Sequence, residues 1–216
     1  MNLLNETVTQ ELLAISRKLS TIEELKDFRL VGGTAIALQL GHRKSVDIDF
    51  FSNESFPKRE LELVLRKHFG EHISVTKTIH SLLCFMDGVR VELYDSWGTP
   101  FLQAPVTIDG IRMATLEDLT NFKMEAIIER REKKDYIDLY FLFQKIKPDA
   151  AFSFHRKSNP YVSRRSILFA FNEVKTAMKN ESPMPEMLKA VLADDIVKAL
   201  RQVAKRQFGK DTGISL

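Results

Sequence analysis

The stretch VGGTAIALQLGHRKSVDIDFFS, residues 31–52, decides how this chain folds. Residues 28–31, FRLV, are typical of a short buried strand, and the glycine pair at 32–33 predicts a tight turn. The apolar residues 34–40 predict a helix that ends at Gly41, and residues 46–51 predict a second strand. The order strand, glycine turn, helix, strand is therefore the centre of the predicted fold.

Two aspartates of the second predicted strand share one face. Alternate side chains of a strand point the same way, so Asp47 and Asp49 face one side, about 7 Å apart along the backbone. Val46, Ile48 and Phe50 are then expected to face the core. Like charges on one face repel unless a cation lies between them, and oxygen ligands suit a hard divalent ion. The pair therefore predicts a site for Mg²⁺, or for Mn²⁺ in its place.

A third carboxylate is expected on a neighbouring strand. Glu92 lies between Val91 and Leu93 in the predicted strand 89–94, just as apolar residues flank the two aspartates. This alternation places Glu92 on the polar face of its strand, where it is a candidate third metal ligand.

The glycine pair and the loop after the helix are candidates for binding an anionic group such as phosphate. Gly32 and Gly33 let the backbone approach a bound group closely, and free N–H groups at a helix start bind phosphate. Thr34 adds a hydroxyl at the same place. Arg43 and Ser45, in the polar loop before the second strand, are further candidate contacts. A solvated surface loop is the alternative for residues 42–45.

Beyond residue 114 the pattern changes to helices, which we expect at 115–131, 134–146, 163–179 and 187–208. We predict an α+β domain over 1–114 and a helical domain over 115–216.

Charge is unevenly distributed along the chain. Residues 145–216 hold 14 Lys and Arg against 7 Asp and Glu, a net charge of +7, whereas the first 144 residues hold 18 against 22, a net charge of −4. A basic tail of this kind suits RNA or an acidic protein, and a set of solvated helices is the alternative.

Composition points to the cytoplasm. The single cysteine, Cys84, cannot form an internal disulfide, and no apolar run is long enough to span a bilayer. The first twenty residues lack a basic leader followed by an apolar core. We therefore expect a soluble cytoplasmic protein without a membrane partner.

A known family shares these motifs. Gly-Gly, thirteen residues and then Asp-x-Asp resembles the signature of the DNA polymerase β-like nucleotidyltransferase superfamily. The segment GGTAIALQLGHRKSVDIDFF, with FKMEAIIERREKKDYIDLYFL at 122–142, resembles more narrowly the AbiEii/AbiGii toxins, minimal nucleotidyltransferases of type IV toxin–antitoxin systems. The resemblance implies a polymerase β-like mixed sheet with flanking helices and a helical C-terminal half.

The resemblance also implies a reaction. A metal-dependent enzyme would transfer a nucleotide from a nucleoside triphosphate (NTP) to an RNA acceptor, with transfer RNA favoured, and a separately encoded antitoxin would restrain it. Asp47 and Asp49 would be catalytic metal ligands, and Gly32 and Gly33 would form the turn that holds the triphosphate.

A second motif is implied at Lys123, Asp135 and Asp138. Lys123 and Arg130 lie on one face of the predicted helix and can reach the same anionic group. Lys123 is therefore a candidate for contacting phosphate or transition-state charge, and Asp135 for orienting Lys123 or contacting the acceptor. Lys134 stands where an arginine commonly precedes the first aspartate, which replaces a bidentate donor by a point charge.

Two other functions fit the same residues. The acceptor can be a small molecule or a protein side chain instead of RNA. The chain can also be a non-catalytic module that binds a nucleotide or a partner, an alternative that Lys134 keeps open.

Overall fold

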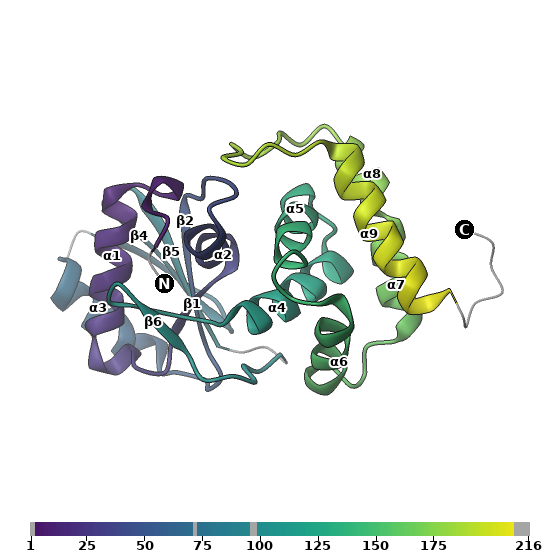
Figure 1. The fold of residues 1–216 in the computed structure, drawn as a ribbon. Coiled ribbons are helices and arrows are strands. Elements are labelled where there is room, and N and C mark those ends of the chain that lie inside the picture. The colour runs from purple at the N-terminus through teal and green to yellow at the C-terminus, as the bar shows by residue number, and fades with distance from the viewer. Residues whose placement is uncertain (1–2, 71–72, 96–98, 210–216) are drawn as a thin grey trace. The chain divides into compact units, whose positions relative to one another are not determined.

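The computed structural model describes residues 3–70, 73–95 and 99–209. The chain divides into two compact units, residues 1–115 and 116–216. The first unit is built on a sheet and the second is helical (Figure 1). The predicted α+β class, a mixed sheet with flanking helices followed by helices, is therefore confirmed.

The sheet of the first unit is mixed. Its order is β3-β4-β5-β2-β1-β7-β6. The two central strands, β1 (Arg29–Val31) and β2 (Asp47–Ser52), pair antiparallel, and β2 pairs parallel with β5 (Val89–Asp95). The remaining strands are β3 (Ser74–Lys77), β4 (Ser81–Met86), β6 (Val106–Ile108) and β7 (Ile111–Met113).

Helix α2 (Gly32–Leu40) connects the two central strands. It begins at the first glycine, so the predicted turn is the first turn of the helix itself. Its residues from Thr34 to Leu40 are buried, and it ends at Gly41 in the left-handed region, φ 64°, as the sequence predicts. A helix buried on nearly every side reads as a continuous apolar run, which is why this segment lacks the usual polar stripe.

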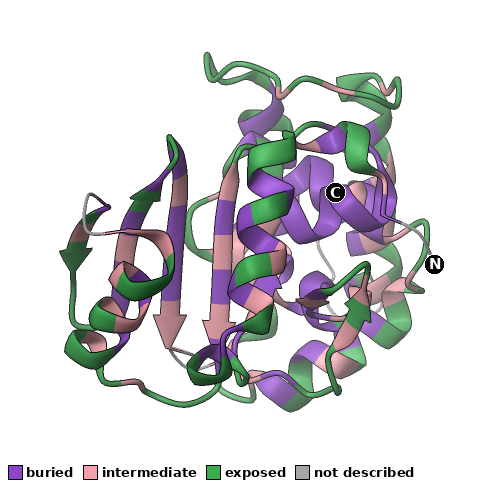
Figure 2. Ribbon diagram, turned by 90° about the vertical axis from the view of Figure 1, so that its left-hand side faces the viewer, coloured by how far each residue is buried: buried purple, intermediate pink, exposed green. Residues whose placement is uncertain are grey.

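Helices α1 (Gln10–Thr21) and α3 (Lys58–Phe69) lie on the same face of the sheet (Figure 1). Helix α1 begins at Gln10 because the Thr9 side chain accepts a hydrogen bond from the Leu12 N–H and caps the helix. Residues before it form the short 3₁₀ turn η1 (Asn5–Thr7), and η2 (Glu23–Leu25) follows α1. Buried and partly exposed bands alternate along the strands (Figure 2), as expected for one covered and one open face.

The second unit contains α4 (Leu116–Glu129), α5 (Lys133–Leu142), α6 (Pro148–Ser158), α7 (Arg164–Asn172), α8 (Val174–Lys179) and α9 (Ala193–Phe208). The sequence interpretation of residues 147–162 as a loop was wrong, because Pro148 occupies the first turn of α6, where its missing N–H costs nothing. The predicted helix 163–179 is two helices, and the last one begins at Ala193 instead of residue 187.

Candidate functional site

Strand β2 presents two aspartates on its partly exposed face. Ile48 and Phe50 are fully buried, whereas Asp47 and Asp49 are partly exposed, so the alternation predicted for this strand holds. The expectation for Val46 was wrong: it precedes the strand and is 69% exposed. The two carboxylates therefore share a face that solvent reaches.

The neighbouring strand β5 adds charged groups to this face. In the parallel register Asp47 is opposite Arg90, and Asp49 is opposite Glu92. Arg90 forms an ion pair with Glu92, and its Nη1 lies 4.0 Å from Asp49 Oδ1. Arg90 was missed by the sequence analysis, although its position two residues before Glu92 places it on the same face. An arginine therefore supplies positive charge among the three carboxylates.

This arginine affects how a metal could bind. In the described part of the chain, no three Asp, Glu, His or Cys side chains are gathered to hold an ion. Asp47 and Asp49 nevertheless present two carboxylates on one face, and Mg²⁺ commonly takes one or two carboxylates together with substrate phosphates. The donor set thus fits a magnesium–nucleotide complex, with Glu92 engaged by Arg90.

Tyr94 completes the polar row on β5. Its ring packs edge-on against Phe51, 4.9 Å between centroids, and its hydroxyl hydrogen-bonds with Glu92 and Arg90. Burial, together with the charges of Asp49 and Glu92, raises the pKa of Tyr94 above its usual value. The phenol therefore stays protonated and able to donate a hydrogen bond at neutral pH.

The glycine pair lies beside these carboxylates because of the strand register. Val31, the last residue of β1, is opposite Asp49, so Asp49 reaches the residue that follows, Gly32. Gly32 has φ +68°, and a Cβ placed on it would overlap the Asp49 carboxylate. A glycine is therefore required at this position for both backbone and space.

Gly33 packs against the guanidinium of Arg43. Arg43, only 5% exposed, donates from Nη1 to the Lys44 carbonyl at 2.8 Å, and its guanidinium occupies the place that a Cβ of residue 33 would fill. The structure thus brings Arg43 to the start of α2. It does not leave this side chain in a solvated loop.

Thr34 and Ser45 connect α2 to the approach of β2. The Thr34 hydroxyl is buried, lies 2.8 Å from Ser45 Oγ and hydrogen-bonds with the Asp47 carbonyl. The Ser45 N–H donates to the Thr7 carbonyl at 2.9 Å. These contacts fix the loop that carries Asp47, so the Thr34 side chain positions the strand and does not point to solvent.

In the second unit, the residues of the second motif form a buried ionic cluster. Lys123 Nζ lies 2.7 Å from Asp135 Oδ1 and 2.8 Å from Asp138 Oδ2. Arg130 donates to both oxygens of Asp135, from Nε at 2.8 Å and Nη2 at 2.9 Å. The anionic group that Lys123 and Arg130 share is therefore Asp135 of the same chain.

Charge compensation outweighs burial in this cluster. Burial alone would lower the pKa of Lys123, but Asp138 and Asp135 hold it above its usual value. Burial would likewise raise the pKa of Asp135, but Lys123 and Arg130 keep it below its usual value. Lys123 and Asp135 are therefore both charged at neutral pH.

The two lysines that precede Asp135 have different surroundings. Lys133 is buried and donates to the carbonyls of Asn180 and Ser182, the first at 3.0 Å. Lys134 is half exposed and pairs with Glu132 at 3.1 Å. Lys134 thus belongs to the surface of α5.

The sequence of residues 13–83, which carries the glycine pair and both aspartates, matches the model of the family described as "Nucleotidyl transferase AbiEii toxin, Type IV TA system". The AbiEii toxins are therefore the family that these residues resemble. The AbiEii region thus defined, residues 13–83, includes β1, α2 and β2 and ends within β4. Arg90 and Glu92 follow it directly in β5.

Other proteins resemble the chain around and beyond the AbiEii region. An uncharacterized protein of Aquifex aeolicus (strain VF5) is 32% identical over 125 residues, which cover 55% of this chain and 59% of the relative's length. JHP933 from Helicobacter pylori has a similar fold, with TM-score 0.56, 16% identity and 94% of each chain covered. The nucleotidyltransferase toxin MenT4 from Mycobacterium tuberculosis H37Rv has TM-score 0.52 and 13% identity, with 93% of this chain and 82% of MenT4 covered.

Two further observations concern membrane spans and the single cysteine. Of the helices in the described part of the chain, none combines the length and apolarity that a membrane span requires. Cys84, at the edge of the AbiEii region, is fully buried, and burial raises its pKa to about 12. This thiol is therefore protonated and unsuited to nucleophilic chemistry.

Replacement of Gly32 by alanine tests the close approach of the Asp49 carboxylate to Gly32. We expect Gly32→Ala to disturb Asp49 and to lower both stability and activity, because the new Cβ overlaps the carboxylate and the backbone has a positive φ. Gly88→Ala is the matched control: Gly88 has φ +80°, but a Cβ added there would meet no atom within 4 Å, so this variant has the backbone strain alone. In both variants the backbone strain should lower the free energy of unfolding by about 1–2 kcal/mol, measured by thermal unfolding. Gly32→Ala should show a further decrease. Equal destabilisation of the two variants would contradict the close approach of Asp49.

Proposed function

We propose that this chain is a metal-dependent nucleotidyltransferase and the toxin of a type IV toxin–antitoxin system, which transfers a nucleotide from an NTP to an RNA acceptor, with transfer RNA favoured. The observation that carries the proposal is the approach of the Asp49 carboxylate to Gly32 at the start of α2. Metal ligands and phosphate-binding N–H groups then share one place, as nucleotidyl transfer requires.

In this proposal Asp47 and Asp49 hold Mg²⁺ or Mn²⁺. When bound, the ion lowers the pKa of an attacking hydroxyl and neutralises triphosphate charge. Glu92 is the third candidate ligand, and its carboxylate would have to exchange Arg90 for the ion. The location of all three on one face of two adjacent strands supports the assignment.

The nucleotide contacts follow from the start of α2. N–H groups of the first helical turn, around Gly32 and Gly33, are free of intrahelical partners and suit the triphosphate. Arg43 lies against Gly33 and adds positive charge there. Thr34 and Ser45 act through the backbone of Asp47, which they support.

For the second motif we assign a positioning role to Lys123, Asp135 and Asp138. Their buried contacts connect α4 to α5, and neither aspartate is exposed. Arg130 is different, because its side chain is 49% exposed and can contact an anion of the acceptor.

The partners follow from charge and family. The net charge of +7 over residues 145–216 favours RNA as the acceptor over a small molecule. A type IV system, the description of the matching family, supplies a separately encoded antitoxin as the restraining partner. A cytoplasmic location is part of the same proposal.

Incubation of the chain with Mg²⁺, one labelled NTP at a time and total cellular RNA tests the proposal. We expect label in RNA, concentrated in the transfer RNA fraction, with one nucleotide preferred. Label in a small product or in protein instead would move the acceptor to those classes. NTP binding without incorporation into any added acceptor would favour the non-catalytic module and contradict the proposed enzyme.

A further inference from the structure

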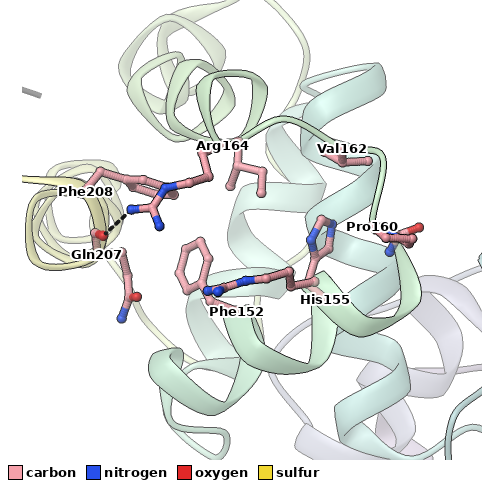
Figure 3. A pocket seen from close by; sticks show the side chains of 10 residues that line it. Phe152, His155, Pro160, Val162, Arg164, Gln207 and Phe208 are labelled. Carbon is pink, nitrogen blue, oxygen red and sulfur yellow. Dashed lines mark hydrogen bonds between the residues drawn. The ribbon is translucent and has the colours of Figure 1, made fainter. Parts of the chain in front are cut away.

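A cavity in the helical unit lies apart from the residues discussed so far. It has a volume of about 220 Å³ and is bounded by the end of α6, the loop after it, the start of α7 and the end of α9. Figure 3 shows Phe152 and His155 of α6 on one side, and Arg164 of α7 with Gln207 and Phe208 of α9 on the other.

Cationic side chains gather in the three helix turns that border this cavity, which we call its rim, and two of them, Arg156 and Arg164, line the cavity itself. The cationic side chains are Arg156 and Lys157 in the last turn of α6, Arg164 and Arg165 in the first turn of α7, and Lys205 and Arg206 in the last turn of α9. Arg206 pairs with Asp149. Within residues 3–70, 73–95 and 99–209, Arg156, Lys157, Arg165 and Lys205 have no carboxylate within ion-pair distance. The rim therefore carries an excess of positive charge.

The acidic side chains that contact the lining are already paired. Asp149 accepts hydrogen bonds from both Arg206 and Gln207, and Glu125 pairs with the buried His155. Neither carboxylate forms an ion pair with Arg156.

The arginines of α7 occupy an electrostatically unfavourable place. The first turn of a helix carries partial positive charge, so a cation there is unfavourable, yet this turn holds two arginines and no acid. Arg164 donates to the Gln207 carbonyl at 3.4 Å, and its guanidinium lies 5.4 Å from the centre of the Phe208 ring (Figure 3). This contact directs one positive charge toward the cavity, and a bound anion would offset the unfavourable charge of the turn.

We propose that this cavity binds the backbone of the RNA acceptor, with a phosphodiester group between Arg156 and Arg164 and the attached nucleoside along the apolar wall formed by Phe152 and Val162. Guanidinium groups suit phosphate because their planar forks donate two parallel hydrogen bonds. The site adds affinity without reading sequence, since phosphate contacts position a nucleic acid and bases specify it. This inference rests on the proposed transfer to RNA and names where the acceptor is held.

RNA fits the cavity better than an acidic peptide. A carboxylate needs only the charged rim, whereas a nucleotide also fills the cavity next to the charges, part of whose wall is apolar. The excess of positive charge over residues 145–216 extends beyond the cavity, which suits a polyanion that continues past the bound group.

Charge reversal at the cavity tests the inference. The variant carries Arg156→Glu and Arg164→Glu, and the matched control carries Lys175→Glu and Lys179→Glu on α8, where both lysines are exposed and neither lines the cavity. We expect RNA affinity, measured by anisotropy of labelled transfer RNA, to fall about tenfold or more in the cavity variant and about twofold in the control. The slope of log K against log salt should decrease by about 2, one for each arginine that no longer binds a phosphate. Thermal unfolding should show both variants folded, since glutamate suits the start of α7.

Three results would overturn the inference. Equal weakening in both variants would mean that only net charge matters. Loss of NTP binding instead of RNA binding would assign the cavity to a triphosphate. Unchanged RNA binding with a weaker affinity for polyglutamate would assign it to acidic peptides. RNA binding needs no turnover, so absence of incorporation by the wild-type protein would contradict the proposed enzyme and leave this test intact.

Discussion

Asp49→Asn is expected to lower nucleotide incorporation about 1,000-fold, equivalent to about 4 kcal/mol of transition-state stabilisation. Asparagine has the same shape as aspartate, so it fits beside Gly32 and preserves the packing at the start of α2. It removes the negative charge that would hold a divalent ion next to the triphosphate. The measurement is the rate of label transfer to RNA, with Mn²⁺ affinity as a second readout. Asp47→Asn should act in the same direction.

Asp87→Asn is the control for this substitution. Asp87 is exposed in the turn between β4 and β5 with φ 49°, a conformation that asparagine also adopts readily. Its incorporation rate and Mn²⁺ affinity should equal those of the wild type. Stability of Asp49→Asn should be unchanged or higher, because one of three neighbouring carboxylates loses its charge. An Asp49→Asn variant with wild-type incorporation would contradict the metal role of this face.

Lys123→Met is expected to have the largest effect on stability. Removing one partner from a buried ionic cluster leaves an uncompensated charge, which typically costs about 3–5 kcal/mol. Asp138, fully buried, would lose the ammonium that lies 2.8 Å away, whereas Asp135 would keep Arg130. Denaturant unfolding of the chain measures this decrease in stability. Adding Asp138→Asn to Lys123→Met should recover part of it, because the stranded charge is removed.

Lys134→Met is the matched control in the same segment. Its half-exposed pair with Glu132 should contribute at most about 1 kcal/mol to stability.

The buried cluster of Lys123, Asp135 and Asp138 also predicts how the stability of the chain depends on pH. The pKa of Asp135 is lowered on folding, so its contribution is complete above about pH 4 and is lost as pH falls through the folded value. The pKa of Lys123 is raised, so its contribution is complete below about pH 10 and is lost as pH rises through the folded value. Equal unfolding energies for Lys123→Met and Lys134→Met would contradict a buried cluster.

Local patterns in the sequence were sufficient for several elements. Period-two alternation located the strand of Asp47 and Asp49, and glycines located both ends of α2. Prediction was poorer where one residue type is compatible with two local structures. Pro148 serves equally in a loop and at the first position of a helix, and in the structure it begins α6, which buries Phe152 and His155. Val46 looked like a strand residue because apolar alternation does not show where pairing begins.

The sequence by itself determined an α+β unit followed by helices, the shared face of the two aspartates and the glycines at the start of α2. These follow from backbone geometry within a few residues of one another. Tertiary structure alone decided that Asp49 reaches Gly32 and that Lys123 is enclosed by Asp135 and Asp138. These contacts join separate strands or separate helices. Which side chains meet there is set by strand register and helix packing, which local periodicity does not specify.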